Sequence, residues 1–175
     1  AKLGFEPWAK SVEAASKGSI KVMLFPAQQL GKAADHYDMA RDGIADMTWV
    51  NPGYQAGRFP MFSAGELPML ISNAGRGSAA LDAWYRTYAV NEMKDVKRCF
   101  AHVHTGTLHS KQALPDPAQI KGMKIRPSNG TMAAFMSLLG ATNVQVSAPE
   151  ARDSLEKGVA DAIVFPWHSI ITFGI

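Results

Sequence analysis

Residues 157–166 have the sequence Lys157-Gly158-Val159-Ala160-Asp161-Ala162-Ile163-Val164-Phe165-Pro166. A lysine followed by glycine is typical of the last turn of a helix, and the apolar run after it is typical of a buried strand that ends at a proline. Helices that alternate with such strands predict an α/β fold, with mainly parallel sheets flanked by helices. Ligands of such folds bind at the carboxyl ends of the strands.

A similar pattern of glycine, β-branched residue, alanine and aspartate occurs at residues 42–47. Two interpretations are open. The likeness is an internal repeat, which gives two similar α/β halves, or it is the ordinary pattern of any helix that ends at glycine before a buried strand.

The same alternation of elements is expected along most of the chain. Apolar spacing predicts helices at 3–15, 35–42, 78–94, 118–121, 131–139 and 148–157, and strands at 19–25, 44–50, 96–103, 123–126, 143–146 and 159–165. We expect Ser78 to cap its helix, and Ser147 to form a capping box with Glu150. Residues 51–74, rich in proline and glycine, are expected to form a long connection of the kind that is often functional.

Length and composition exclude several classes of protein. A chain of 175 residues suits one domain or two small lobes, and a content of 47% hydrophobic and 19% charged residues indicates a packed globular chain. The net charge of +3 comes from scattered residues, so nucleic acid is not expected as a partner. No run reaches the roughly 18 apolar residues of a membrane span, and no signal peptide is present in this chain. The lone Cys99 is expected to be an inert core residue.

The usual enzyme motifs are absent, but a group of histidines leaves one alternative open. His102 and His104 flank Val103, so on a strand both imidazoles point to one face, and His109 follows closely. The alternative is a small α/β enzyme that uses these histidines as a base or as metal ligands. Two histidines without a supporting carboxylate or thiol are too few for a metal site, so neither a metal nor another cofactor is predicted.

One arginine stands where a ligand site is expected. Arg126 is the last residue of an apolar strand, and it is followed by Pro127 and by the small polar residues 128–131 at the start of a helix. A guanidinium beside the positive end of a helix suits a carboxylate held by two hydrogen bonds. The alternative is a surface arginine that pairs with an aspartate or glutamate.

Six motifs in order resemble those of the extracytoplasmic solute-binding proteins of TRAP transporters, the DctP family. They cover nearly the whole chain and are Phe25-Pro26-Ala27-Gln28-Gln29-Leu30-Gly31, Asp42-Gly43-Ile44-Ala45-Asp46, Leu67-Pro68, Lys121-Gly122-Met123-Lys124-Ile125-Arg126, Leu139-Gly140-Ala141 and Gly158-Val159-Ala160-Asp161.

The resemblance implies a two-lobed periplasmic receptor and not an enzyme. Such a monomeric receptor closes like a flytrap on an organic acid and delivers it to a membrane permease. The first lobe would comprise residues 1–105 and the second residues 106–175. Both lobes are expected to be partial, because family members have a strand before the opening helix and a long helix at the C-terminus. The family's arginine that binds the ligand carboxylate corresponds to Arg126.

Departures from the family pattern indicate an apolar pocket. Leu108 stands where many members have a second arginine, and Phe165 stands where many have asparagine. Residues 51–54 are uncharged where some relatives carry a charged contact. Together with Arg126 we therefore expect polar contacts from Asn51, Tyr54 and His109 and apolar walls from Phe165, Trp167, Trp49 and Leu108, although the two tryptophans would equally suit the core. Such a pocket favours an aromatic or apolar monocarboxylate, or a 2-oxo acid.

Overall fold

A computed structural model describes residues 4–175, and the chain divides into two compact units at Lys32. The first unit contains α1 (Phe5–Ala15), followed by an extended segment. Gly18, with φ of 81°, donates its N–H to the carbonyl of Glu13 at 2.8 Å, which ends the helix where the sequence predicts. Leu3, the expected first residue of this helix, lies outside the described residues.

The second unit contains a four-stranded sheet in the order β1-β4-β2-β3. Its strands are β1 (Thr107–Ser110), β2 (Lys124–Arg126), β3 (Thr142–Asn143) and β4 (Ala162–Phe165). β2 runs parallel to both β3 and β4, whereas β1 pairs with β4 in the antiparallel sense. The α/β class is therefore confirmed, with an antiparallel edge strand that the sequence did not predict.

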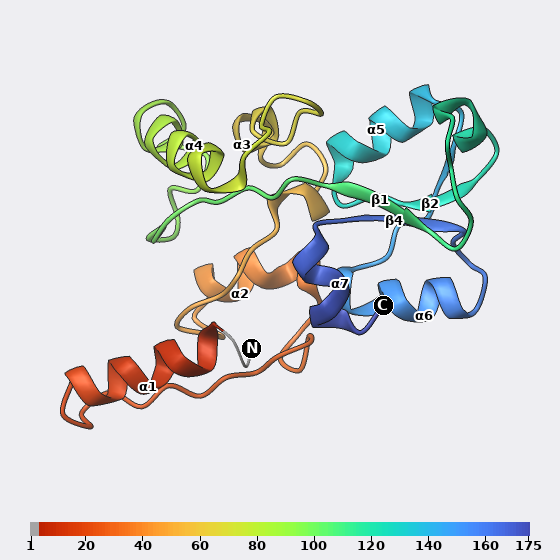
Figure 1. Ribbon diagram of the computed structural model, residues 1–175. Coiled ribbons are helices and arrows are strands. Elements are labelled where there is room, and N and C mark those ends of the chain that lie inside the picture. The colour runs from red at the N-terminus through yellow and green to blue at the C-terminus, as the bar shows by residue number, and fades with distance from the viewer. Residues whose placement is uncertain (1–3) are drawn as a thin grey trace. The chain divides into compact units, whose positions relative to one another are not determined.

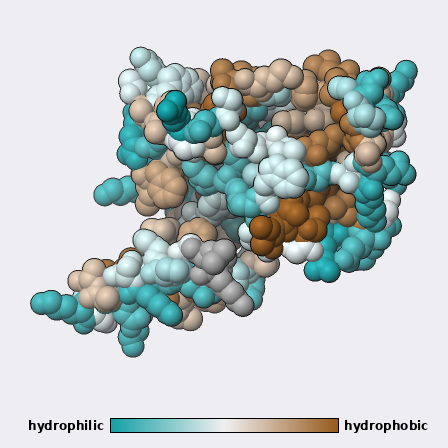
Figure 2. All heavy atoms as spheres, viewed as in Figure 1, coloured by the Kyte–Doolittle hydropathy of each residue, from teal (hydrophilic) through white to brown (hydrophobic). Residues whose placement is uncertain are grey.

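Helices cover both faces of this sheet (Figure 1), with α5 (Gly130–Leu138) on one face and α6 (Ala151–Glu156) and α7 (Trp167–Phe173) on the other. Successive residues of β4 face opposite sides of the sheet. Val164 packs in the core cluster that includes residues of α5, and Ile163 packs in the cluster that includes residues of α6. All four residues of β4 are buried, and each large apolar side chain buried in this way contributes roughly 1.5–3 kcal/mol. Figure 2 shows an apolar patch over α7, whose Ile171 is exposed.

Residues 33–106 contribute mainly helices. These are η1 (Ala33–Asp35), α2 (His36–Arg41), η2 (Pro52–Tyr54), α3 (Pro60–Ala64) and α4 (Ala74–Tyr88). Their core is aromatic, with Tyr37, Phe59, Phe62 and Tyr85 buried together. Glu92 fixes the start of α3, because its carboxylate accepts the N–H groups of residues 61 and 62 and the Tyr85 hydroxyl.

The fourth α-helix begins four residues earlier than predicted. Asn73 caps it by accepting the N–H of Arg76 at 2.9 Å. Ser78 lies within the helix, where its hydroxyl accepts the N–H of Val103 at 3.0 Å and donates to the Val103 carbonyl at 3.3 Å. Ser78 is therefore not the cap of this helix; its side chain instead fixes the segment that leads to the sheet. The helix also ends at Tyr88 and not at Lys94.

The strands expected at 19–25, 44–50 and 96–103 are not formed. A strand requires a partner for its backbone hydrogen bonds, and within residues 4–175 none of the three segments has one; residues 44–47 form bends. Of the strand expected at 143–146, only Asn143 lies in a strand, β3. Cys99 is exposed and not in the core.

The second half follows the sequence more closely. Ser147 and Glu150 form the predicted capping box before α6, and η3 (Pro117–Ile120) replaces the brief helix expected there. No described helix is long and apolar enough to cross a membrane.

Candidate functional site

The predicted anchor residue is held at the end of a central strand. Arg126 is the last residue of β2 and is only 1% exposed. Its guanidinium donates to the carbonyls of Val146 (3.0 Å) and Val164 (3.4 Å) and to the Tyr54 hydroxyl (3.2 Å). The same group lies over the Phe165 ring, 4.6 Å from its centroid. Four neighbours thus fix its position before any ligand arrives.

No salt bridge found in the described part of the chain involves Arg126, although the charge of Glu150 acts on it. The alternative of a surface arginine in a salt bridge is therefore wrong. Burial lowers the pKa of Arg126, while the Tyr54 phenol and the charge of Glu150 oppose this shift. The groups that Arg126 contacts directly are neutral, and a buried cation in such contacts favours an anion as a further partner.

The segment 51–54 reaches the arginine from the other side. The hydroxyl of Tyr54 accepts the N–H of Ala148 at 3.0 Å as well as the Arg126 hydrogen bond. Asn51 accepts the N–H of Gly53 and donates its amide to the Ser128 carbonyl at 3.4 Å. The structure therefore brings two of the expected polar residues to the strand ends, Tyr54 beside the arginine and Asn51 against residue 128.

Phe165 lies directly on the arginine. Its ring is stacked on Phe173, with the centroids 5.5 Å apart and the planes at 8° to each other. Phe165 is therefore enclosed between the guanidinium and α7, and it is buried. The structure shows Phe165 in contact with Arg126, the residue expected to bind the carboxylate. That Phe165 also forms a wall of the ligand pocket stays a prediction.

The other second-lobe candidates lie along β1 and at the start of α7. His109 lies with Nε2 3.0 Å from the Phe165 carbonyl, and its ring meets Trp167 edge-on at 4.7 Å. Trp167 is 70% exposed and so is not a core residue. Leu108 is opposite Val164 in the sheet and packs in the core on the α5 side. Of these three residues, His109 and Trp167 lie near Phe165, whereas Leu108 does not.

Trp49 belongs to a different group, a row of aromatic rings and histidines. Its ring lies 6.3 Å from that of His102, and Trp49 is 41% exposed. The Nε2 atoms of His102 and His104 are 3.1 Å apart, which confirms that the two share a face, and His104 also lies against His168. The sequence did not indicate that His168, some sixty positions later, would join them.

The pKa values of His102 and His104 are both lowered. Burial, followed by the charges of His102 and His168, lowers the pKa of His104 to about 4, and burial also lowers the pKa of His102. Within the described residues no group of three or more histidine, cysteine or acidic side chains could hold a metal ion. The arrangement suits packing between rings.

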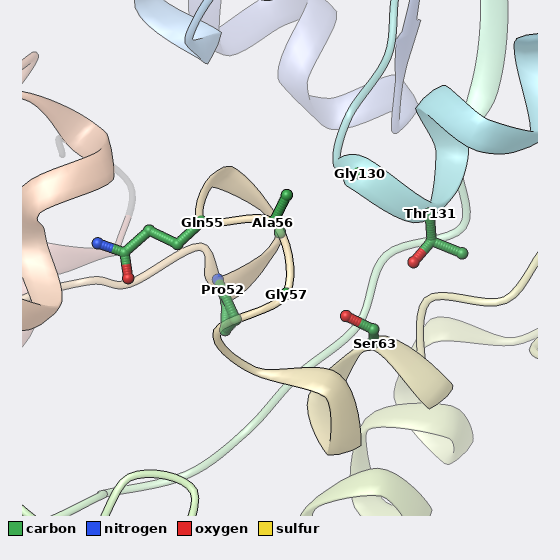
Figure 3. A pocket seen from close by; sticks show the side chains of 8 residues that line it. Pro52, Gln55, Ala56, Gly57, Ser63, Gly130 and Thr131 are labelled. Carbon is green, nitrogen blue, oxygen red and sulfur yellow. The ribbon is translucent and has the colours of Figure 1, made fainter.

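A cavity of about 280 Å³ lies between the loop that follows η2 and the start of α5. In Figure 3 the side chains of Ser63 and Thr131 lie on the same side of it, while Gln55 points away. The sequence had marked the polar residues 128–131 only as neighbours of Arg126. The lining residues are Pro52, Gly53, Gln55, Ala56, Gly57, Ser63, Gly130 and Thr131.

Comparisons with known proteins agree on one group. The family model described as "Bacterial extracellular solute-binding protein, family 7" matches residues 2–175. The 2,3-diketo-L-gulonate-binding periplasmic protein YiaO of Escherichia coli is 30% identical over 158 residues, which cover 86% of this chain and 48% of that protein. The chain spans about half the length of the curated relatives it matches.

Two solved structures are more similar. A TRAP solute-binding protein from Rhodoferax ferrireducens, in complex with copurified benzoate, has a TM-score of 0.92 and 34% identity, covering 98% of this chain and 54% of that one. A marine metagenome TRAP solute-binding protein specific for aromatic acids, in complex with 3-hydroxybenzoate, has a TM-score of 0.90 and 37% identity, covering 97% and 54%. The relatives are solute-binding proteins and not enzymes, so the histidine-based enzyme is excluded as an alternative.

Proposed function

This chain belongs to the DctP family of bacterial extracellular solute-binding proteins, and on that premise we propose that it binds an aromatic monocarboxylate through Arg126. The observation that carries the proposal is the guanidinium itself. It is buried at the carboxyl end of β2, and within the described residues it forms no ion pair with an acidic side chain. A ligand carboxylate would supply a negative charge in direct contact with the guanidinium.

The position of Arg126 suits a carboxylate for a second reason. Its Nε and Nη1 groups donate to backbone carbonyls, while Nη2 donates to the Tyr54 hydroxyl. A movement of Tyr54 would free Nη2 for a ligand oxygen without disturbing the other two hydrogen bonds. Charge-assisted hydrogen bonds of this kind are about twice as strong as neutral ones.

The surroundings of the arginine favour an aromatic or apolar body. His109 and Trp167 present ring surface near Phe165, and no further charged side chain contacts Arg126 among the described residues. Two similar structures contain benzoate and 3-hydroxybenzoate. A dicarboxylate would need a second cation that residues 51–54 and 108 do not offer. Aromatic monocarboxylates therefore come first, with 2-oxo acids as the next class to test.

Capture would follow from closure of two lobes, 1–105 and 106–175, around the ligand. A ligand that contacts both lobes stabilises the closed form by its extra contacts there. We further propose that the receptor acts in the periplasm as a monomer and delivers the acid to the permease of a TRAP transporter.

A thermal-shift measurement with purified protein tests this proposal. We expect benzoate and 3-hydroxybenzoate to raise the melting temperature, succinate to leave it unchanged, and Arg126→Ala to abolish the shift. Arg126→Lys should also weaken binding, because an ammonium cannot reproduce the fork that donates to the Val146 and Val164 carbonyls while it binds the ligand. Arg98→Ala is the matched control and should retain the shift. It removes a guanidinium elsewhere in the chain, one that pairs with Asp82. An unchanged benzoate shift in Arg126→Ala would contradict the proposal.

A further inference from the structure

A second buried ionisable group lies outside the Arg126 site, where the loop after α3 meets η2. Glu66 follows α3, and its Oε2 atom is buried with no hydrogen-bond partner among the described residues. A Cβ atom placed on Gly53 would lie only 3.0 and 3.1 Å from the two carboxyl oxygens. The backbone of η2 therefore lies directly against this carboxyl.

The start of α5 encloses the carboxyl from the other side. Asn129 caps α5, because its Oδ1 accepts the N–H of Met132 at 2.8 Å. Its side chain also interacts with Glu66 and lowers the pKa of that carboxyl. The same Cβ placed on Gly53 would overlap with the Cβ of Asn129, so η2 and the start of α5 are in contact with no room for a methyl group. Glu66 is thus enclosed where residues of the predicted first and second lobes meet.

No charged side chain compensates this carboxyl. α3 and α5 contain no titratable residue. In η2, Tyr54 directs its hydroxyl to Arg126. In α4, which packs on Gly65 through Leu81, Asp82 forms ion pairs with Arg86 and Arg98.

The other titratable groups of α4 also lie away from Glu66. Tyr85 donates to Glu92, and Arg76 and Tyr88 are exposed. Between η2 and α3, Arg58 pairs with Asp38. The surroundings of Glu66 are therefore neutral from every side.

Such an environment favours the protonated acid. Burial raises the pKa of Glu66 to about 7, and the interaction with Asn129 opposes this shift. An ionised carboxylate with a buried oxygen that accepts no hydrogen bond is costly, whereas the neutral acid loses much less on burial. The contact between η2 and α5 is therefore linked to the proton on Glu66.

We propose that Glu66 is a pH-sensitive latch, which in its neutral form holds residues 51–57 against the start of α5 and releases them when it ionises. The inference rests on the proposed receptor function, because a contact between the predicted lobes affects binding only if the lobes close on a ligand. The contact is strongest below the ordinary pKa of an exposed glutamate, about 4.5, and weakens as the pH rises from there to about 7. Above pH 7 both forms are ionised and no further change is expected.

The latch can be tested without any ligand. Carbon-13 NMR of the glutamate carboxyl groups should give Glu66 a pKa near 7. Hydrogen exchange at the Met132 amide, corrected for intrinsic rates, reports on the Asn129 cap. We expect its protection to fall by no more than about tenfold per pH unit between pH 4.5 and 7, since one proton is released on opening.

Two variants and one control separate the latch from general stability. Glu66→Gln should keep the low-pH protection at all pH values, because glutamine stays neutral. Gly53→Ala should lose the protection at every pH while the buried Tyr85 amide of α4 stays protected. Glu13→Gln, on an exposed face of α1, should behave like the wild type.

Two results would overturn the proposal: a Glu66 pKa near 4.5, or a pH dependence of Met132 protection that persists in Glu66→Gln. These results are distinct from a failure of the receptor function, which is judged by the benzoate shift and its loss in Arg126→Ala. If the latch operates, benzoate should also bind more weakly at pH 8 than at pH 5.5, and this difference should disappear in Glu66→Gln.

Discussion

The hydroxyl of Tyr54 lies 3.2 Å from Nη2 of Arg126, although the two residues are 72 positions apart in the chain. The same oxygen accepts the backbone N–H of Ala148 at 3.0 Å. One phenol therefore satisfies a buried guanidinium and a backbone donor of the segment that leads into α6. This contact connects residues 51–54 with the carboxyl end of β2.

Tyr54→Phe should destabilise the protein by about 1–3 kcal/mol, because two donors lose their acceptor while the ring stays in place. Urea denaturation followed by circular dichroism measures the change. Tyr88→Phe is the matched control, since Tyr88 is exposed and should lose less than about 0.5 kcal/mol. Equal stability of Tyr54→Phe and the wild type would show that water replaces the hydroxyl.

The sequence predicted the sheet half of the fold better than the helical half. Local patterns suffice where an element is defined by its own residues: Gly18 and Gly158 end helices with positive φ, and Ser147 forms its capping box. A strand depends on a distant partner, so the apolar run 44–50 looked like a strand but has no partner within the described residues. β1 was missed because its short, half-buried sequence has no distinct period.

The candidate site shows the same limit. Arg126 was identified because a charged residue at the end of an apolar strand is unusual in a local window. The position of Glu66 against Gly53 and Asn129 depends on packing between distant segments, and no local pattern indicates it. The stacking of Phe165 on Phe173 was likewise out of reach, because α7 was not predicted.

Two glycines of α4 should respond oppositely to alanine. A Cβ on Gly77 would overlap with the Ile71 side chain, whereas a Cβ on Gly75 meets only Asn73 Oδ1, at an ordinary 3.5 Å. Gly77→Ala should therefore destabilise by about 1–3 kcal/mol. Gly75→Ala should be neutral or stabilise by less than about 1 kcal/mol, because alanine favours the helix. Denaturation midpoints of the two variants, each compared with the wild type, decide the matter.

The neutral state of His104 should be visible by NMR. Burial, with the charges of His102 and His168, lowers the pKa of His104 to about 4. The folded protein therefore takes up this proton at a lower pH than the unfolded chain does. His104 therefore contributes stability above about pH 6.5 that is lost as the pH falls toward 4. A titration of the imidazole signals should give this low value, and His168→Gln should raise it. His36→Gln is the control, since His36 bonds to the Trp49 carbonyl, and it should leave the His104 value unchanged.

Asp82 should determine part of the acid stability. Burial alone would raise its pKa, but hydrogen bonds from Arg86, Arg98 and the N–H of Ala101 outweigh burial and hold the pKa at about 2. Because the unfolded value is near 3.8, this stabilisation is complete above about pH 4 and is lost as the pH falls through 2. The side chain is 22% exposed, so solvent reduces the contribution to about 1–2 kcal/mol.

Asp82→Asn should therefore lower the free energy of unfolding at pH 7 by about 1–2 kcal/mol and flatten its decline below pH 4, as urea titrations at several pH values would show. Asp153→Asn removes an exposed partner of Lys157 and is the matched control, with an expected change below about 0.5 kcal/mol. If both variants kept the steep acid decline of the wild type, other carboxylates would carry the acid sensitivity. If only Asp82→Asn flattens it, the hydrogen bonds that join α4 to Arg98 and Ala101 are its source.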